Sequence, residues 1–134
     1  MPGVSPLILL VEDEPDLREV ITDLLELDGA KFRIEIASNY DDGAVLLNAS
    51  QPTLLIANVL LPGGGDGLRL AEVARRIDVP TLLISGHPEV IAKQEAQGLP
   101  FLSKPFRLPE LQQAIRTLID GEPVATNLEQ AKPD

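Results

Sequence analysis

The sequence has no cysteine and no tryptophan, and aromatic residues make up only 3% of its 134 residues. Without cysteine, disulfide bonds and metal sites built from thiolates are excluded. With so few aromatic rings, the interior has to be built from aliphatic side chains, which provide most of the 44% hydrophobic content. The chain is long enough to bury such an interior as one domain.

Long apolar runs and an export signal are also missing. No apolar stretch approaches the roughly 20 residues that a membrane-spanning helix needs. The opening Met1-Pro2-Gly3 does not begin a basic, apolar signal peptide. We therefore expect a cytoplasmic protein with no membrane-bound segment.

Basic residues are scarce relative to acidic ones. Eleven Lys and Arg stand against 21 Asp and Glu, which gives a formal net charge of −10. Such a chain repels the phosphate backbone of nucleic acids, so direct binding of DNA or RNA is not expected. Solubility alone accounts for an acidic surface; the alternatives are contact with a basic partner or a cation site.

Apolar runs alternate with helix-like segments along the chain. Short continuous runs predict strands, and apolar residues recurring every three or four positions predict helices. Strands are expected at residues 6–12, 32–37, 53–58, 79–84 and 100–103, and helices at 15–28, 41–49, 67–77, 88–97 and 108–120. This alternation predicts an α/β domain over residues 6–120, with a doubly wound parallel (βα)5 sheet, followed by a polar tail or linker over residues 121–134.

Polar side chains stand where four of the apolar runs end. The first run stops at Glu12 and Asp13, the third at Asn58, the fourth at Ser85 and the fifth at Lys104. In a parallel sheet the carboxyl ends of the strands meet at one edge, where ligands bind. Acids, a hydroxyl and an amine at one edge are typical of a metal-assisted phosphoryl site, here with an amide where an acceptor carboxylate is expected.

Four segments together carry a resemblance to a known family. They are Val11-Glu12-Asp13-Glu14, Asn58-Val59-Leu60-Leu61-Pro62-Gly63, Ser85-Gly86-His87 and Phe101-Leu102-Ser103-Lys104-Pro105-Phe106. With them, residues 6–120 resemble the receiver domain of bacterial response regulators, the CheY-like family. The resemblance implies a flavodoxin-like sheet in the order 2-1-3-4-5 and a role in two-component phosphorelay signal transduction.

The family chemistry implies partners and a cofactor. A histidine kinase or phosphotransfer protein donates a phosphoryl group to an aspartate beside a bound Mg²⁺, and a downstream protein partner responds. A homodimer is also compatible with the resemblance. Residues 121–134 hold no DNA-binding helix-turn-helix, so we expect output through protein contacts, from a stand-alone regulator or an excised domain.

The resemblance also implies metal ligands. Asp13 matches the direct ligand, Glu12 the acid that acts through water, and the backbone carbonyl of Leu60 and the side-chain oxygen of Asn58 complete the set. The alternative for the acidic residues is capping of the following helix, because acids favour a helix N-terminus. Capping suits Glu14 best.

Three further residues match the activation machinery. Ser85 matches the hydroxyl that binds a phosphoryl oxygen, Phe101 the aromatic switch that follows it, and Lys104 the phosphate-binding amine. Their alternatives are a turn serine, a core aromatic and a solvated lysine. Lys104-Pro105 is a candidate cis peptide bond, and His87 is expected to be exposed and non-catalytic.

Two segments call for separate interpretation. Residues 62–67 are rich in glycine but lack the GxxxxGK[ST] pattern of a phosphate loop, so they predict a flexible turn. The helix expected at 88–97 is shorter than is usual in the family, which argues against transfer of a standard dimer geometry.

Asn58 occupies the position of the phospho-acceptor in this resemblance. An amide is a poor nucleophile and carries no charge, so the chain is expected neither to accept phosphate nor to act as an enzyme. Either Asn58 is an engineered replacement in a working receiver, or it is natural in a pseudo-receiver that acts as a phosphorylation-independent interaction module. An aspartyl-phosphate hydrolase is disfavoured, because the sequence lacks a DxD pair and a cap insertion.

Overall fold

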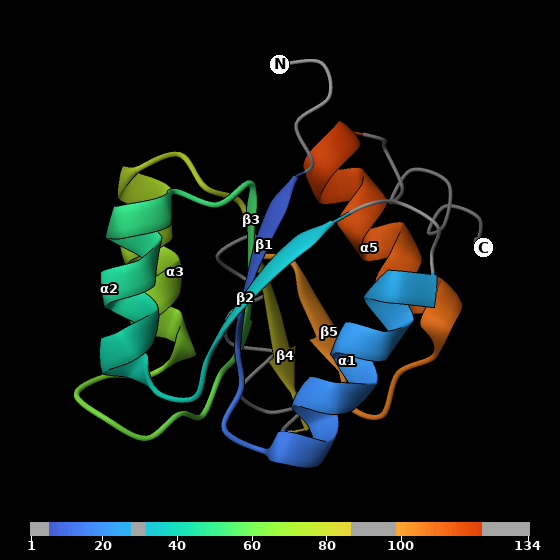
Figure 1. Cartoon of the computed structure of the whole chain (residues 1–134), viewed down its shortest axis with the longest axis horizontal. Helices are drawn as coiled ribbons and strands as arrows, with labels where there is room; N and C mark the ends of the chain where they lie inside the picture. Colours follow the sequence, from blue (N-terminus) through green and yellow to red (C-terminus); the bar gives the residue numbers. More distant parts are fainter. Residues whose placement is uncertain (1–5, 28–31, 87–98, 122–134) are drawn as a thin grey trace.

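The computed structural model describes residues 6–27, 32–86 and 99–121. Within these ranges the chain forms five strands and four helices (Figure 1): β1 (Leu7–Val11), α1 (Pro15–Leu27), β2 (Arg33–Ala37), α2 (Tyr40–Ser50), β3 (Leu54–Asn58), α3 (Gly67–Arg76), β4 (Thr81–Ser85), β5 (Phe101–Ser103) and α5 (Leu108–Asp120). The expected helix at 88–97, His87 and the tail beyond Gly121 lie outside the described residues. Every other expected element is present, with bounds that differ by a residue or two.

The strands form one parallel sheet in the order β2-β1-β3-β4-β5, which confirms the predicted topology. The register places Val11 beside Ala57, Asn58 beside Ile84, and Ser85 beside Ser103. All five strands therefore finish at the same edge of the sheet, and the residues that follow them lie at that edge.

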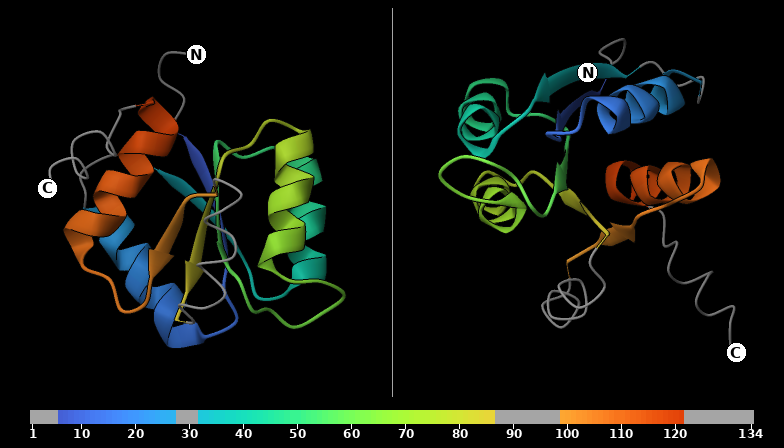
Figure 2. Two further views of the ribbon diagram at one scale, coloured as in Figure 1. Left: turned by 180° about the vertical axis from the view of Figure 1, so that it is seen from behind. Right: turned by 90° about the horizontal axis from the view of Figure 1, so that it is seen from below.

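Helices cover both faces of the sheet. α2 and α3 lie side by side on one face, and α1 and α5 lie on the other (Figures 1 and 2). Alternate residues of the central strands point to opposite faces. Leu9, Leu55 and Leu83 join the core that includes α2 and α3 residues, whereas Leu10, Ile56 and Ile84 join the core of α1 and α5.

β1, β3 and β4 are buried along their whole length. Because both of their faces need apolar side chains, these strands appear in the sequence as continuous apolar runs rather than alternating ones. β2 lies at the edge of the sheet, and its Arg33 and Ile36 are exposed while Ile34 and Glu35 are only partly buried. This position explains its weaker apolar pattern.

The start of α3 is determined by two adjacent residues. Asp66 is the N-cap and accepts a hydrogen bond from the Arg69 amide at 3.0 Å. Small buried residues then follow at Gly67, Ala71 and Ala74, and they let α3 pack closely on the sheet.

The largest boundary difference is at β4, which begins at Thr81 rather than residue 79. The Val79 amide donates to the Ala74 carbonyl at 2.9 Å and so still belongs to the end of α3. Ser85 is the last residue of the strand instead of the first residue after it. Among the helices of the described ranges, none is long and apolar enough to cross a membrane.

Candidate functional site

A cavity of about 350 Å³ lies at the carboxyl edge of the sheet. Segments that follow four different strands line it, with Asp13, Glu14, Asn58, Leu60, Gly86 and Lys104. The structure thus brings together Asp13, Asn58, Leu60 and Lys104, four of the residues singled out in the sequence. Asp13 is exposed at the rim, whereas Asn58 is only 8% exposed.

Glu12 lies directly after β1 and is fully buried. Its backbone amide donates to the Ala37 carbonyl at 3.0 Å, and its carbonyl accepts from Arg18 Nη1 at 3.1 Å. Its Oε2 accepts from the Glu14 amide at 3.1 Å, but its Oε1 has no hydrogen-bond partner among the described residues. Burial raises the pKa of Glu12, while the Glu14 amide and the Lys104 charge act in the opposite direction.

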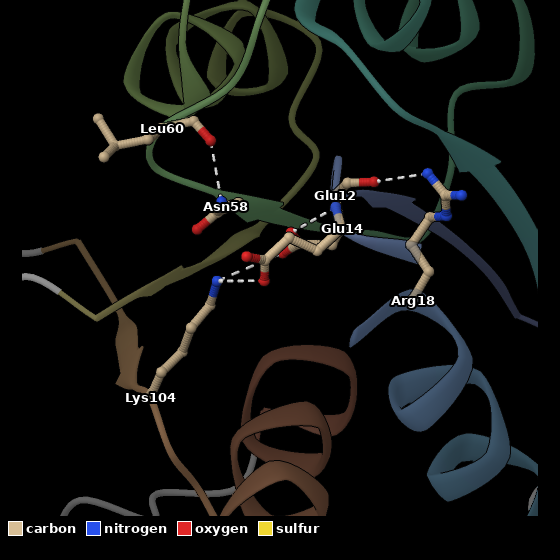
Figure 3. Close-up of polar contacts among 6 residues, drawn as sticks. All are labelled: Glu12, Glu14, Arg18, Asn58, Leu60 and Lys104. Atoms are coloured by element: carbon tan, nitrogen blue, oxygen red, sulfur yellow. Dashed lines mark hydrogen bonds and ion pairs between the residues drawn. The ribbon is translucent and has the colours of Figure 1, made fainter. Parts of the chain in front are cut away.

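Lys104 reaches from the end of β5 toward these acids (Figure 3). Its backbone amide donates to the Ser85 carbonyl at 2.8 Å, which extends the pairing of β4 and β5 by one residue. Its Nζ lies 3.6 Å from Glu12 Oε1 and 3.9 Å from Glu14 Oε1. These separations are too long for hydrogen bonds, so the contacts are ion pairs that contain no hydrogen bond. The Lys104-Pro105 bond is cis, as predicted.

Asn58 ends β3 and turns its amide toward the following loop (Figure 3). Its Nδ2 donates to the backbone carbonyl of Leu60 at 2.9 Å. If the amide were turned over, Oδ1 of Asn58 would face the Leu60 carbonyl oxygen at this distance with no hydrogen between them. The orientation with Nδ2 toward the carbonyl is therefore the favourable one. The carbonyl of Leu60 faces Asn58, while the residue as a whole is 52% exposed.

The loop between β3 and α3 is tied to both of its neighbours. The Gly67 amide donates to the Val59 carbonyl at 2.8 Å, and the Tyr40 amide donates to the Pro62 carbonyl at 2.9 Å. The Gly64 amide donates to Asp41 Oδ2 at 3.1 Å. The turn expected here is present, and it is anchored to the start of α2.

Ser85 and Phe101 are not among the residues that line the cavity. Ser85 is buried at the end of β4, opposite Ser103 of β5. Phe101 pairs with Leu83 and is partly buried against the core that includes α2 and α3 residues. Core packing is therefore the observed environment of Phe101, and its role as a switch stays a prediction.

The family model of the response regulator receiver domain matches residues 8–116. This match covers most of the chain. The chain belongs to the response regulator receiver domain family.

Curated relatives of this receiver domain are longer proteins. It is 31% identical over 121 residues to the nitrogen assimilation regulatory protein NtrX of Azorhizobium caulinodans, covering 83% of this chain and 26% of the relative. It is also 31% identical over 121 residues to the phosphate regulon transcriptional regulatory protein PhoB of Klebsiella pneumoniae, covering 84% and 51%. The chain thus spans a quarter to a half of the length of these relatives.

Solved structures show the same fold. A response regulator receiver protein from Sinorhizobium medicae aligns with a TM-score of 0.76 at 26% identity, covering 87% of this chain and 95% of that one. The receiver domain of a modulated diguanylate cyclase from Desulfovibrio desulfuricans also aligns with a TM-score of 0.76, at 20% identity, covering 88% and 96%.

Two residues of this receiver domain matter at the site although the sequence did not single them out for it. Glu14 was assigned to capping; it directly precedes α1, and its carbonyl accepts from the Arg18 amide at 3.0 Å. Its carboxylate also lines the cavity and pairs with Lys104. A Cβ on Gly67 would lie 2.9 Å from Val59 Cα and closer still to the Asn58 carbonyl oxygen. In the sequence, the feature that could have identified Gly67 is its position directly after Asp66, the N-cap of α3.

The arrangement at Asn58 and Leu60 does not fit a divalent cation. Oxygen ligands at adjacent corners of a Mg²⁺ octahedron lie roughly 3 Å apart. The Asn58 side chain and the Leu60 carbonyl have this spacing, but the atom that faces the carbonyl is the neutral NH₂ nitrogen of the amide, which has no free lone pair for a metal. The carboxylate of Glu12 is paired with Lys104. Among the described residues, no three or more His, Cys, Asp or Glu side chains form a group that could hold a metal ion.

Proposed function

We propose that this receiver domain serves in a two-component phosphorelay in a form that does not accept phosphate at position 58. The observation that carries the proposal is the placement of Asn58. Its neutral amide stands in the wall of a cavity that also contains the carboxylate of Asp13 and the amine of Lys104. The surroundings suit phosphoryl chemistry, while the side chain at the acceptor position does not.

The chemistry of the amide supports this proposal. The phosphoryl acceptor of the receiver family is a carboxylate, whose oxygen attacks phosphorus and forms an acyl phosphate. The nitrogen lone pair of an amide is delocalised, and Nδ2 of Asn58 already donates a hydrogen bond to the Leu60 carbonyl. We therefore expect no turnover on another substrate, since the chemistry in this family is only self-modification.

The partners in this proposal are proteins. A histidine kinase or a phosphotransfer protein would dock at the edge that carries the cavity, and a downstream protein would read the conformation. The relatives named NtrX and PhoB are regulatory proteins that extend well beyond the matched segment. An output attached to this receiver, a second copy of it, or a separate protein are all compatible with the proposal.

A second candidate function is favoured by one specific observation. The hydrogen bond from Asn58 to Leu60 needs a donor, and an ionised aspartate has none. Asn58 is thus integrated into the site rather than merely tolerated there. This integration favours a natural pseudo-receiver that signals by binding alone over a replacement in a working receiver.

Intact-mass measurement after incubation with acetyl phosphate and Mg²⁺ tests both proposals. The wild-type chain and Asn58→Asp are compared, with Asn48→Asp as a variant of equal charge on the exposed surface of α2. An adduct on Asn58→Asp alone supports a receiver disabled at one functional group. No adduct on any of the three supports the pseudo-receiver. An adduct on the wild-type chain refutes both proposals, because the acceptor then lies elsewhere.

A further inference from the structure

We infer that the carboxamide of Asn58 is an internal substitute for a divalent cation, so that this edge of the receiver is ordered without metal. The inference rests on the proposed function, because it takes position 58 as the place where a carboxylate and Mg²⁺ would otherwise meet. It concerns a positioning role of Asn58, which acts on the Leu60 carbonyl and through it on the loop between β3 and α3.

The geometry of the hydrogen bond carries the first step. Nδ2 of Asn58 and the carbonyl oxygen of Leu60 are 2.9 Å apart. Two oxygens bound at adjacent corners of Mg²⁺ would have nearly the same separation, roughly 3 Å. In this chain a proton on nitrogen occupies the space between the two groups, so the backbone is held as a shared cation would hold it. The hydrogen bond and the shared metal are mutually exclusive, because coordination by Asn58 would require its amide to turn over.

The local charges carry the second step. The carboxylates of Asp13 and Glu14 line the cavity and Glu12 lies buried beside it, with Lys104 as the cation that pairs with Glu12 and Glu14. A carboxylate at position 58 would add a further negative charge and would face the partial negative charge of the Leu60 carbonyl. That arrangement needs a cation between the two groups, whereas the neutral amide needs none.

The anchoring of the loop carries the third step. From Leu60 the chain continues to Pro62, whose carbonyl accepts from the Tyr40 amide, and it returns to the sheet where the Gly67 amide donates to Val59. Leu60 is held only one residue away from Val59, so its position governs where the loop leaves the sheet. The Tyr40 and Gly67 amides therefore report on the order of this loop.

Hydrogen exchange at the Tyr40 and Gly67 amides tests the inference, measured by NMR on the 134-residue chain in EDTA and in excess MgCl₂. In the wild-type chain both exchange rates are expected to be the same in the two solutions, within about twofold. In Asn58→Asp both amides are expected to exchange faster in EDTA and to be protected again by Mg²⁺. In Asn58→Leu, which has neither donor nor charge, exchange is expected to be faster in both solutions.

Urea denaturation of the same proteins gives a second readout. At a Mg²⁺ concentration one hundred times its dissociation constant, Asn58→Asp should gain about a hundredfold in its ratio of folded to unfolded molecules. The wild-type chain and the charge-matched Asn48→Asp should gain about twofold or less under the same conditions. The wild-type measurements need no variant. Stabilisation of the wild-type chain by Mg²⁺ would therefore refute the inference even where a substitution prevents folding.

Two results would overturn the inference. One is protection or stabilisation of the wild-type chain by Mg²⁺ to the extent expected of Asn58→Asp. The other is unchanged exchange at Tyr40 and Gly67 in Asn58→Leu, since the hydrogen bond would then not hold the loop. Neither result depends on phosphoryl transfer. Failure of the proposed function instead appears as a phosphoryl adduct on the wild-type chain, so the two failures are distinguishable.

Discussion

Replacing Lys104 by methionine removes the only positive charge that the structure places against the buried carboxylate of Glu12 among the described residues. Methionine keeps most of the length and the apolar stem of lysine. We expect the variant to fold but to lose stability, because Glu12 Oε1, which has no hydrogen-bond partner in the part of the chain that the structure describes, would also lose its ion pair. Of the partners in the described ranges, only the Glu14 amide would remain against that carboxylate.

The size of the loss follows from the distance and the exposure. At 3.6 Å, with an effective dielectric constant of about 20, the attraction of Lys104 for Glu12 is about 5 kcal/mol before desolvation is counted. Loss of one partner of a buried pair costs about 3–5 kcal/mol, while exposed pairs contribute about 0–1 kcal/mol. The side chain of Lys104 is 23% exposed and Glu12 is fully buried, so we expect about 2 kcal/mol.

The same loss should depend on pH. Burial raises the pKa of Glu12 above 4.5, so ionised Glu12 by itself lowers stability above its folded pKa and has no effect below its unfolded pKa. The attraction of Lys104 exists only while Glu12 is ionised. Without Lys104 the pKa of Glu12 is raised further, so the difference in stability between the wild-type chain and Lys104→Met is largest above the pKa of Glu12 in the variant. It falls as the pH is lowered and is lost once the pH is below the pKa of Glu12 in the folded wild-type chain.

Urea denaturation in EDTA at a series of pH values measures this difference, and a double-mutant cycle with Glu12→Gln isolates the pair. In the Glu12→Gln background, Lys104→Met should cost only a few tenths of a kcal/mol, because Glu14 is an exposed partner. A coupling energy below about 0.3 kcal/mol would refute the reasoning, since additive sites differ by about that much. A loss that does not change with pH would also refute it.

Three further outcomes are expected from substitutions elsewhere. Gly67→Ala should destabilise the chain by about 1–3 kcal/mol in urea denaturation, because its Cβ would press on the backbone of Asn58 and Val59. Gly86→Ala, whose Cβ would only reach ordinary contact with Lys104, is the control, and equal losses would contradict the argument. Thr81→Val should leave stability unchanged or raise it, because Oγ1 of Thr81 is buried without a hydrogen-bond partner among the described residues; a loss above about 1 kcal/mol would imply a partner for the hydroxyl. Asp66→Ala should cost about 0.5–2 kcal/mol through loss of the N-cap of α3, and Asp66→Asn should recover most of it.

The sequence was sufficient for the fold and for the edge of the sheet where the candidate site lies. Strands buried on both faces have to be apolar throughout, and the runs that became β1, β3 and β4 are therefore recognisable without a structure. Parallel strands joined by helices then bring their carboxyl ends to one edge. For this reason Glu12, Asn58 and Lys104 could be expected to lie near one another before any coordinate was known.

Two expectations needed correction, because they depend on contacts that cannot be read from the order of residue types. β4 begins two residues later than its apolar run, because Val79 still bonds to Ala74 at the end of α3. The capping assignment of Glu14 was incomplete for a similar reason. Whether its carboxylate serves α1 or Lys104 is decided by where β5 ends, and that segment lies about 90 residues further along the chain.

Only the tertiary structure decided how the residues of the site are paired. From the sequence, Asn58 was expected to offer its side-chain oxygen to a metal, whereas in the structure its nitrogen donates to the Leu60 carbonyl at 2.9 Å. The sequence allowed Lys104 to be solvated or directed inward, and the pairing of β5 with β4 aims it at Glu12 and Glu14. Residue types and their order determine which groups reach the edge of the sheet. Distances of 3 to 4 Å between groups far apart in the chain, set by register and packing, determine which of them interact.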